Sequence, residues 1–327
     1  MAQRAIGTAV AASLILGALA CSSTSGSSGG VAPGGGGASS SGASSGSSGT
    51  SSGSSGTSSG SSGSGGDGGT SGDGGATSPS IPKPVGACPA FQNGMVTFHP
   101  AAGPRTVQLY LNPATLAKHG PLVLYWYATY GSPAQATEAL GTAMQTLQGL
   151  GGIVAAPADN GTGQFPWIDN VDAHMLLADE IVGCAAAAGI DTKRVHALGF
   201  SAGALMTTQL AFGRSGWLAS VATYSGGLID ATVPAYQNAS NDFAALILTG
   251  GTSDNVFNTD FQKASLAFQA ELKKDGHSAL YCDHGGGHAI PPAYTAAVGQ
   301  FFLDHPFGTN PSPYVGALPA ALKACTF

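Results

Sequence analysis

Short apolar runs alternate with longer segments rich in helix formers from residue 106 onward. Residues 122–127 (LVLYWY) are apolar throughout, as expected of a strand that helices cover on both faces. The pattern predicts strands at 106–111, 122–127, 152–155, 194–199, 220–224, 244–249 and 278–282, and helices at 134–150, 170–188, 202–210, 260–275 and 292–303. Strands separated in this way form a mostly parallel α/β sheet through right-handed crossovers, with helices on both faces. Active sites in such sheets lie beyond the carboxyl ends of the strands.

The boundaries of two predicted helices carry specific signals. Asp169 stands where an N-cap is expected for the helix at 170–188, and Gly189 lies just past its end. Asp260 has the same N-cap position before the helix at 260–275.

The first 20 residues differ in composition from everything that follows. Residues 1–20 hold a single charge, Arg4, and then an apolar run, which predicts a secretory signal peptide. Small residues immediately before Cys21 resemble the lipobox of bacterial lipoproteins, although Ala18 stands where leucine is commonest. We therefore expect export, with Cys21 lipidated and anchoring the chain at the cell envelope. The alternative is cleavage after Ala20 that leaves an unmodified cysteine.

Residues 21–80 consist almost entirely of Ser, Gly, Thr and Ala. Such a segment has nothing to bury, so a disordered linker is expected. The folded part is then 81–327, a length that suits one α/β catalytic domain. Charged residues make up 9% of the chain and the net charge is −6, without a basic patch that would indicate nucleic acid. We expect a monomer without cofactor or metal, whose membrane contact is only the lipid anchor.

Four cysteines remain in the predicted folded domain. In an exported protein they predict two disulfides among Cys88, Cys184, Cys282 and Cys325, with three possible pairings. Cys88 with Cys184 and Cys282 with Cys325 is the pairing we favour, and four free buried thiols are the alternative. The spacings match no zinc site.

Residues 199–203 (GFSAG) form a G-x-S-x-G pattern between a predicted strand and a predicted helix. The pattern alone is weak, because it also occurs by chance in the Ser/Gly linker, and an ordinary glycine-flanked turn is the alternative. Only the copy at Ser201 has a strand before it and a helix after it. That context raises a serine hydroxyl above a sheet, where a base and a substrate both reach it. Ser201 is therefore the predicted nucleophile.

A serine nucleophile needs a base, and the base needs an orienting acid. Asp254 follows the predicted strand at 244–249 directly, which places its carboxylate at a strand end. His288 follows three glycines that allow its loop to bring the imidazole to Ser201, whereas His284 is expected at the surface or as a neighbour. The predicted triad is Ser201, Asp254 and His288, in the chain order of this fold. The N–H of Ala202 is one expected oxyanion donor, and the loop after 122–127 should supply the other.

The run from residue 121 to 302 resembles exported α/β-hydrolase esterases of the poly(3-hydroxybutyrate) depolymerase type, and of carbohydrate esterase family 1, which contains feruloyl and acetyl xylan esterases. The matching segments are PLVLYWY at 121, DNVDAHMLLADEI at 169, GIDTKRVHALGFSAGALM at 189, GGTSDNVF at 250 and GGGHAIPP at 285. The resemblance implies an α/β-hydrolase fold and ester hydrolysis by the same three residues. Tyr127-Ala128 departs from the His-Gly pair usual in these families, and alignment assigns the second oxyanion donor to Thr129.

The substrate is less well defined by the sequence. Four aromatic residues are candidates for lining an apolar cleft, with core packing as the alternative for each: Tyr130, Phe165, Trp167 and Tyr224. We expect no additional substrate-binding domain, and therefore expect soluble short esters or esterified polysaccharide fragments as substrates in preference to insoluble polyester. Two rival functions are a non-catalytic surface binding protein that kept the fold and a serine peptidase.

Overall fold

The structure is a computed structural model that describes residues 78–159, 166–229 and 232–327, and all of them lie in one compact unit. The predicted signal peptide, Cys21 and residues 22–77 of the predicted linker lie outside the described residues. Ser80 already belongs to the folded domain, because its N–H donates a 2.7 Å hydrogen bond to the carbonyl of Gly216.

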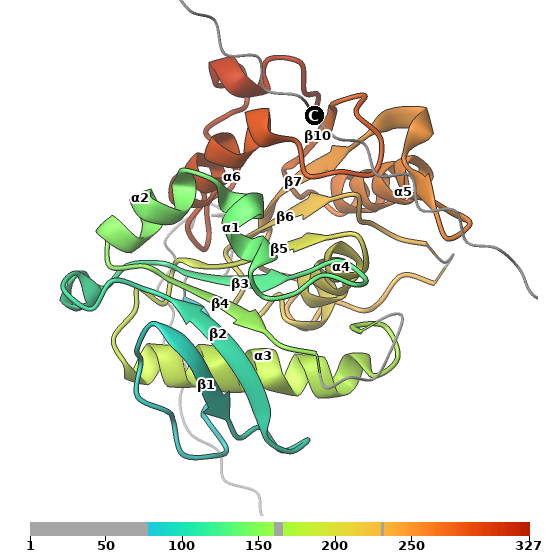
Figure 1. Cartoon of the computed structure of the whole chain (residues 1–327). Helices are drawn as coiled ribbons and strands as arrows, with labels where there is room; N and C mark the ends of the chain where they lie inside the picture. The colour runs from blue at the N-terminus through green and yellow to red at the C-terminus, as the bar shows by residue number, and fades with distance from the viewer. Residues whose placement is uncertain (1–77, 160–165, 230–231) are drawn as a thin grey trace, which may run out of the picture. The chain divides into compact units, whose positions relative to one another are not determined.

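An eight-stranded sheet forms the centre of the domain, in the order β1-β2-β4-β3-β5-β6-β7-β10 (Figure 1). β1 and β2 pair antiparallel and β2 joins β4 antiparallel, while every pair from β4 to β10 is parallel. Its strands are β1 (Gly94–Phe98), β2 (Arg105–Tyr110), β3 (Leu122–Trp126), β4 (Ile153–Pro157), β5 (Val195–Phe200), β6 (Ser220–Tyr224), β7 (Ala244–Thr249) and β10 (Ala279–Asp283). The sequence pattern missed β1, a short strand with only two residues, Val96 and Phe98, turned into the core.

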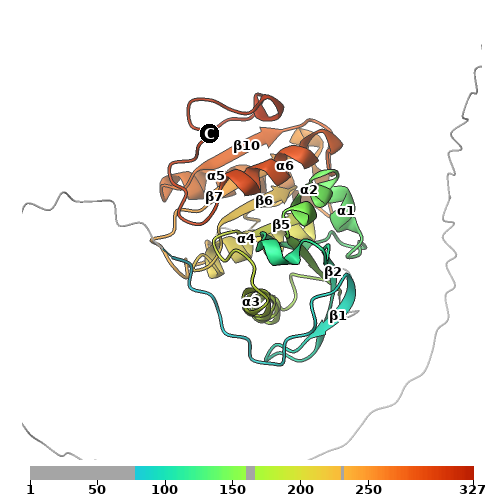
Figure 2. The same ribbon diagram turned by 90° about the vertical axis from the view of Figure 1, so that its left-hand side faces the viewer.

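Helices cover both faces of this sheet. They are α1 (Gln135–Leu140), α2 (Ala143–Gly149), α3 (Val171–Ala187), α4 (Ala202–Gly213), α5 (Phe261–Lys274) and α6 (Pro292–Asp304). α6 packs against α1 and α2 on one face, whereas α3 packs against α4 on the other; Figure 2 shows α3 almost end-on. Short 3-10 turns lie at Leu116–Lys118, Gly251–Ser253 and Ala320–Leu322, and a small hairpin joins β8 (Asn255–Val256) to β9 (Thr259–Asp260). A mostly parallel sheet with helices on both faces, in this strand order, is the predicted α/β-hydrolase fold.

Two helix predictions need correction. The single helix predicted at 134–150 is divided into α1 and α2 at Gly141, whose φ is +49° and where a Cβ would lie 2.5 Å from Oγ1 of Thr295. Close packing against α6 therefore selects glycine and breaks the helix. The N-cap of α3 is Asn170 instead of Asp169, because the Asn170 side chain accepts the N–H of Ala173. The predicted cap at Asp260 is confirmed, since its carboxylate accepts the N–H of Lys263.

Two disulfides fasten terminal segments to the core, in the favoured pairing. Cys88–Cys184 joins the N-terminal segment to α3, and the adjacent N–H groups of Val85 and Gly86 donate to the carboxylate of Glu180. Cys282–Cys325 joins β10 to the C-terminal segment.

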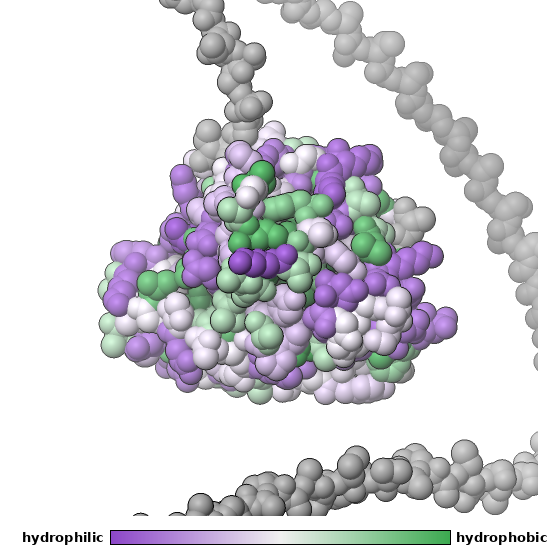
Figure 3. Space-filling view, turned by 90° about the horizontal axis from the view of Figure 1, so that it is seen from above, coloured by the Kyte–Doolittle hydropathy of each residue, from purple (hydrophilic) through white to green (hydrophobic). Residues whose placement is uncertain are grey.

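The surface viewed in Figure 3 mixes hydrophilic and hydrophobic residues, and the hydrophobic ones gather in small groups. Such a mosaic is ordinary for a folded domain, whose polar atoms cannot cover all of its surface. Across the part of the chain that the structure describes, no helix is both long and apolar enough to cross a bilayer.

Candidate active site

Ser201 occupies the corner between β5 and α4. Its backbone has φ +56° and ψ −122°, a conformation that few residues other than glycine adopt. A Cβ on Gly199 would lie 2.2 Å from the carbonyl oxygen of Gly203, and a Cβ on Gly203 would lie 1.9 Å from that of Trp126. Both flanking glycines are therefore required by close backbone contact, which the G-x-S-x-G pattern predicted.

Three side chains from separate loops join in one line of hydrogen bonds. Nε2 of His288 lies 2.8 Å from Oγ of Ser201, and Nδ1 of His288 lies 2.7 Å from Oδ1 of Asp254. The parallel register explains their meeting, because Phe200 pairs with Tyr224 and Thr249 pairs with Asp283 at one edge of the sheet. The predicted Ser201, Asp254 and His288 are thus brought together.

His284, the other candidate base, has a different environment. Its Nδ1 accepts the N–H of Gly286 at 3.2 Å, and its ring lies 6.5 Å from that of Tyr294. The structure therefore brings His288, and not His284, to Ser201.

The carboxylate of Asp254 is buried, with 1% of its surface exposed. Burial alone would raise its pKa, but the hydrogen bonds from His288, from the N–H of Gly250 and from the hydroxyls of Ser225 and Thr249 lower the pKa below its usual value. The last three donors all reach Oδ2, at 2.8, 2.8 and 2.9 Å. Oδ2 is thereby fixed as an acceptor, and Oδ1 is left for the imidazole.

The imidazole of His288 is held by its loop and by two aromatic rings. The N–H of Gly287 donates to the carbonyl of Gly250, which ties the histidine loop to the aspartate loop. The rings of Phe200 and Phe261 lie 5.0 and 4.6 Å from the imidazole. This apolar packing restricts the ring to one orientation and shields its hydrogen bonds from water.

The N–H groups of Ala202 and Thr129 are placed to serve an oxyanion. Ala202 is the first residue of α4, whose N–H has no carbonyl partner within the helix, and both residues line the pocket that contains Ser201. Among the described residues, neither N–H makes a backbone hydrogen bond. Donors that are free and next to the nucleophile suit a developing negative charge.

The Tyr127-Ala128 departure is accommodated by a well-bonded loop. The Ala128 N–H donates to Oε1 of Gln135 at 3.0 Å, and the same oxygen accepts the hydroxyl of Tyr125. The Tyr127 carbonyl accepts the indole N–H of Trp167, and the Tyr127 hydroxyl accepts the N–H of Asp159. Alanine therefore fits the turn because side chains fix the backbone that a glycine would leave free.

A pocket of about 230 Å³ opens beside Ser201. Its walls are mostly apolar side chains, and the described residues that line it are Thr129, Ile168, Asp169, Ser201, Ala202, Leu205, Ile229, Val256, Phe257, Thr259 and Phe261. Sequence reasoning missed its apolar walls. Leu205 could have been found, since it lies one helical turn after the nucleophile.

The predicted cleft aromatics have different fates. Tyr224 is fully buried, and its hydroxyl donates to the carbonyl of Ala139, so packing in the core replaces the predicted contact with substrate. Trp167 is also buried but borders a second pocket. Tyr130 is 77% exposed, and its ring lies 6.3 Å from that of Phe257. Phe165 lies outside the described residues.

In the described part of the chain, no group of three or more His, Cys, Asp or Glu side chains is placed to hold a metal ion.

Comparison with known proteins finds a family model that matches part of the chain, one curated relative and solved structures of the same fold. Residues 168–305, which include Ser201, Asp254 and His288, match the model of the phospholipase/carboxylesterase family. The inferred esterase NocK of Nocardia uniformis subsp. tsuyamanensis is 32% identical over 136 residues, a match that covers 38% of this chain and 38% of NocK. The chain thus spans well under half the length of this curated relative.

Two solved structures share the fold at low sequence identity. Native pOPH has a TM-score of 0.58 and 17% identity, over 73% of this chain and 96% of that one. Native sOPH has a TM-score of 0.59 and 16% identity, over 75% and 96%. These likenesses show the fold alone.

Proposed function

We propose that this protein is a serine esterase that hydrolyses carboxylic esters through an acyl-enzyme intermediate. The observation that carries the proposal is the continuous line of hydrogen bonds from Ser201 through His288 to Asp254. The match to a phospholipase/carboxylesterase family over the same residues and the partial match to NocK support the same chemistry.

In the first half of the reaction, Nε2 of His288 accepts the proton of Ser201 as Oγ attacks the ester carbonyl carbon. The tetrahedral oxyanion receives the N–H groups of Ala202 and Thr129. Asp254, ionised because its hydrogen bonds lower its pKa, holds Nδ1–H and stabilises the imidazolium. Collapse of the intermediate breaks the bond to the alcohol, which leaves with the proton from His288.

In the second half, water takes the place of the alcohol. His288 accepts a proton from the water, whose oxygen attacks the acyl carbon, and the same two N–H groups stabilise the second oxyanion. Collapse releases the carboxylic acid and returns the proton to Oγ of Ser201. The two halves use one set of groups, so no cofactor enters the balance.

The proposal also covers the location of the enzyme and the class of its substrates. The charge pattern of residues 1–20 and the small residues before Cys21 support export and lipid anchoring. Residues 21–80 would then separate the catalytic domain from the membrane. Sequence resemblance supports substrates of the feruloyl, acetyl xylan or hydroxybutyrate type.

The test is turnover of p-nitrophenyl acetate and methyl ferulate by the full chain, together with labelling by a fluorophosphonate probe. We expect turnover of at least one of the two esters and a single label on Ser201. Folded protein that neither hydrolyses an ester nor takes the label would reject the esterase and favour a binding protein that kept the fold.

A further inference from the structure

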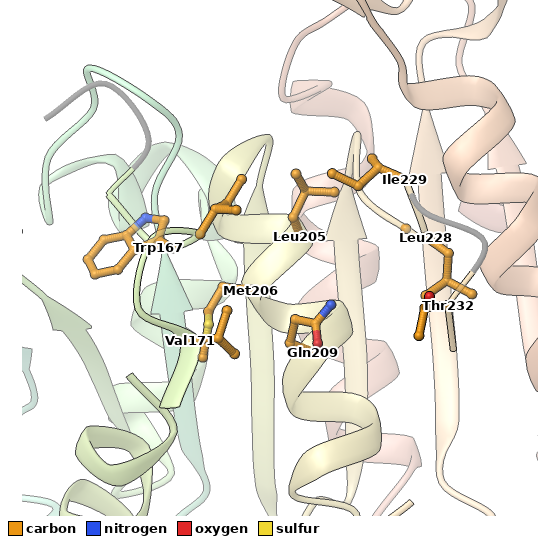
Figure 4. A pocket seen from close by; sticks show the side chains of 10 residues that line it. Trp167, Val171, Leu205, Met206, Gln209, Leu228, Ile229 and Thr232 are labelled. Carbon is orange, nitrogen blue, oxygen red and sulfur yellow. The ribbon is translucent and has the colours of Figure 1, made fainter. Parts of the chain in front are cut away.

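A second, smaller pocket adjoins the one that contains Ser201. It has a volume of about 80 Å³, and it shares Ile168, Leu205 and Ile229 with the larger pocket. In Figure 4, Leu205 and Ile229 stand at its upper end, and Gln209 lies deeper along α4. These three shared residues border both pockets, and we call them the neck.

The chemistry of this pocket is apolar with an uncharged polar end. Trp167, Val171, Met206 and Leu228 contribute apolar surface, while Gln209 and Thr232 supply an amide and a hydroxyl. Among the described residues that line it, none is ionisable at neutral pH, and these walls suit an uncharged group.

The direction of the leaving group distinguishes the two ends of the site. The alcohol takes its proton from Nε2 of His288, so it must depart on the side of that ring. Phe261 contacts the imidazole at 4.6 Å, and the β8–β9 hairpin that supplies Val256 and Phe257 lies directly before it in the chain. The walls formed by these residues thus belong to the alcohol.

The acyl group must extend in the opposite direction from the alcohol. On that side of the site the β8–β9 hairpin contributes no residue to the wall. Leu205 lies one turn after Ser201 on α4, and with Ile168 and Ile229 it forms the neck that leads to the second pocket. The neck is apolar, and a chain attached to the carbonyl carbon can enter it without exposing or burying a charge.

We propose, on the basis of the esterase function above, that the second pocket is the acyl-chain site and that it selects short aliphatic acyl groups. Its size decides the class: an engineered cavity of about 150 Å³ holds benzene, whereas this one has about 80 Å³. A chain of butanoyl size matches this volume, whereas a feruloyl group, which is larger than benzene, exceeds it. The pocket therefore favours an aliphatic acyl group over a feruloyl group.

The test compares acyl and alcohol series on the full chain and on Val171→Phe. Val171 lines the pocket as the first residue of α3, and phenylalanine would fill it. Leu176→Phe is the matched control, because Leu176 lies on the same helix, is 40% exposed and is absent from both pockets. The probes are p-nitrophenyl acetate, butanoate and octanoate, and acetate esters of methanol, butanol and hexanol.

For the wild type we expect kcat/KM to peak at butanoate. Val171→Phe should lower the butanoate-to-acetate ratio by about tenfold, the lower end of what a pocket gains per methylene. Leu176→Phe should leave that ratio unchanged. The alcohol series should respond equally in all three proteins.

Leu205→Ala provides the opposite change if Val171→Phe fails to fold. Widening the neck should raise the octanoate-to-butanoate ratio severalfold. The acyl-site assignment would be overturned if both variants kept the wild-type acyl preference, or if they changed the alcohol preference and left the acyl preference unaltered. In either case, ester turnover by the wild type would still support the esterase function. A wild type that hydrolyses none of these esters would instead reject the esterase, and the acyl site with it.

Discussion

Gly250 and Gly287 meet so closely that a Cβ on Gly250 would lie 1.8 Å from the carbonyl oxygen of Gly287. Their contact, with the hydrogen bond from Gly287 N–H to Gly250 O at 3.0 Å, joins the loop that carries Asp254 to the loop that carries His288. The distance between acid and base is therefore set by the backbone as well as by their own hydrogen bond.

Gly250→Ala should displace the histidine loop and lower kcat by about 100-fold, since misplacement of a catalytic group by about 1 Å has that scale of effect. Gly285→Ala is the control, because Gly285 lies in the same loop with φ +65° and has open space around its would-be Cβ. It should cost about 1 kcal/mol of stability and leave kcat near wild type. Equal losses of kcat in the two variants would show that loop strain, not the Gly250–Gly287 contact, is responsible.

Gln135 should matter for the oxyanion loop although it is remote from the substrate carbonyl. Its Oε1 accepts the N–H of Ala128 next to Thr129, so Gln135→Ala should let the loop relax and lower kcat by about tenfold, less than direct loss of an oxyanion donor. KM should change less than kcat, because the transition state depends most on that donor. The exposed Gln145, on α2, supplies the control variant Gln145→Ala. Unchanged kcat in Gln135→Ala would show that this hydrogen bond does not position the oxyanion donor of Thr129.

Acid should destabilise the domain through its buried histidines. Burial, with the charge of Arg105 nearby, lowers the pKa of His174 to about 4, and burial also lowers the pKa values of His196, His277 and His305. Because these pKa values are lower in the folded chain, the unfolded chain binds more protons than the folded chain below about pH 6.5. The free energy of unfolding is therefore highest above that pH and decreases as the pH falls below it.

Urea unfolding at pH 7.5 and pH 5 measures this effect with the disulfides intact. We expect a lower free energy of unfolding at pH 5, by up to about 1.4 kcal/mol per pH unit for each histidine that the unfolded chain protonates. Equal free energies at the two pH values would contradict the neutral burial of these side chains.

The sequence could predict the triad because each member follows a strand end with an unusual local pattern. Ser201 has its two glycines, Asp254 follows a fully apolar strand and His288 follows three glycines. The register of the parallel strands then brings their carboxyl ends to the same edge of the sheet, and this follows from the strand order alone. The position of Thr129 beside Ser201 likewise follows from its place after β3.

The pocket walls could not be predicted in the same way. Phe257 has φ +51° in a hairpin of two-residue strands, too short to give a periodic signal. Ile168 and Ile229 come from irregular segments whose approach to Leu205 depends on packing at long range. Tyr224 was predicted to line the cleft because an aromatic residue at a strand end can face either the cleft or the core. The position of α1, whose Ala139 carbonyl accepts the Tyr224 hydroxyl, places this side chain in the core.

In the proposed mechanism Ser201 forms an acyl-enzyme with His288 as its base. The most direct measurement is mass spectrometry of peptides from protein quenched during turnover of p-nitrophenyl acetate, alongside kcat for Ser201→Ala, His288→Ala and His284→Ala. We expect an acetyl group on Ser201, losses in kcat of about 10⁵–10⁶-fold for the first two variants and a small effect for the third. Near wild-type turnover by Ser201→Ala with unchanged circular dichroism, or acetylation at another residue during turnover, would contradict this mechanism.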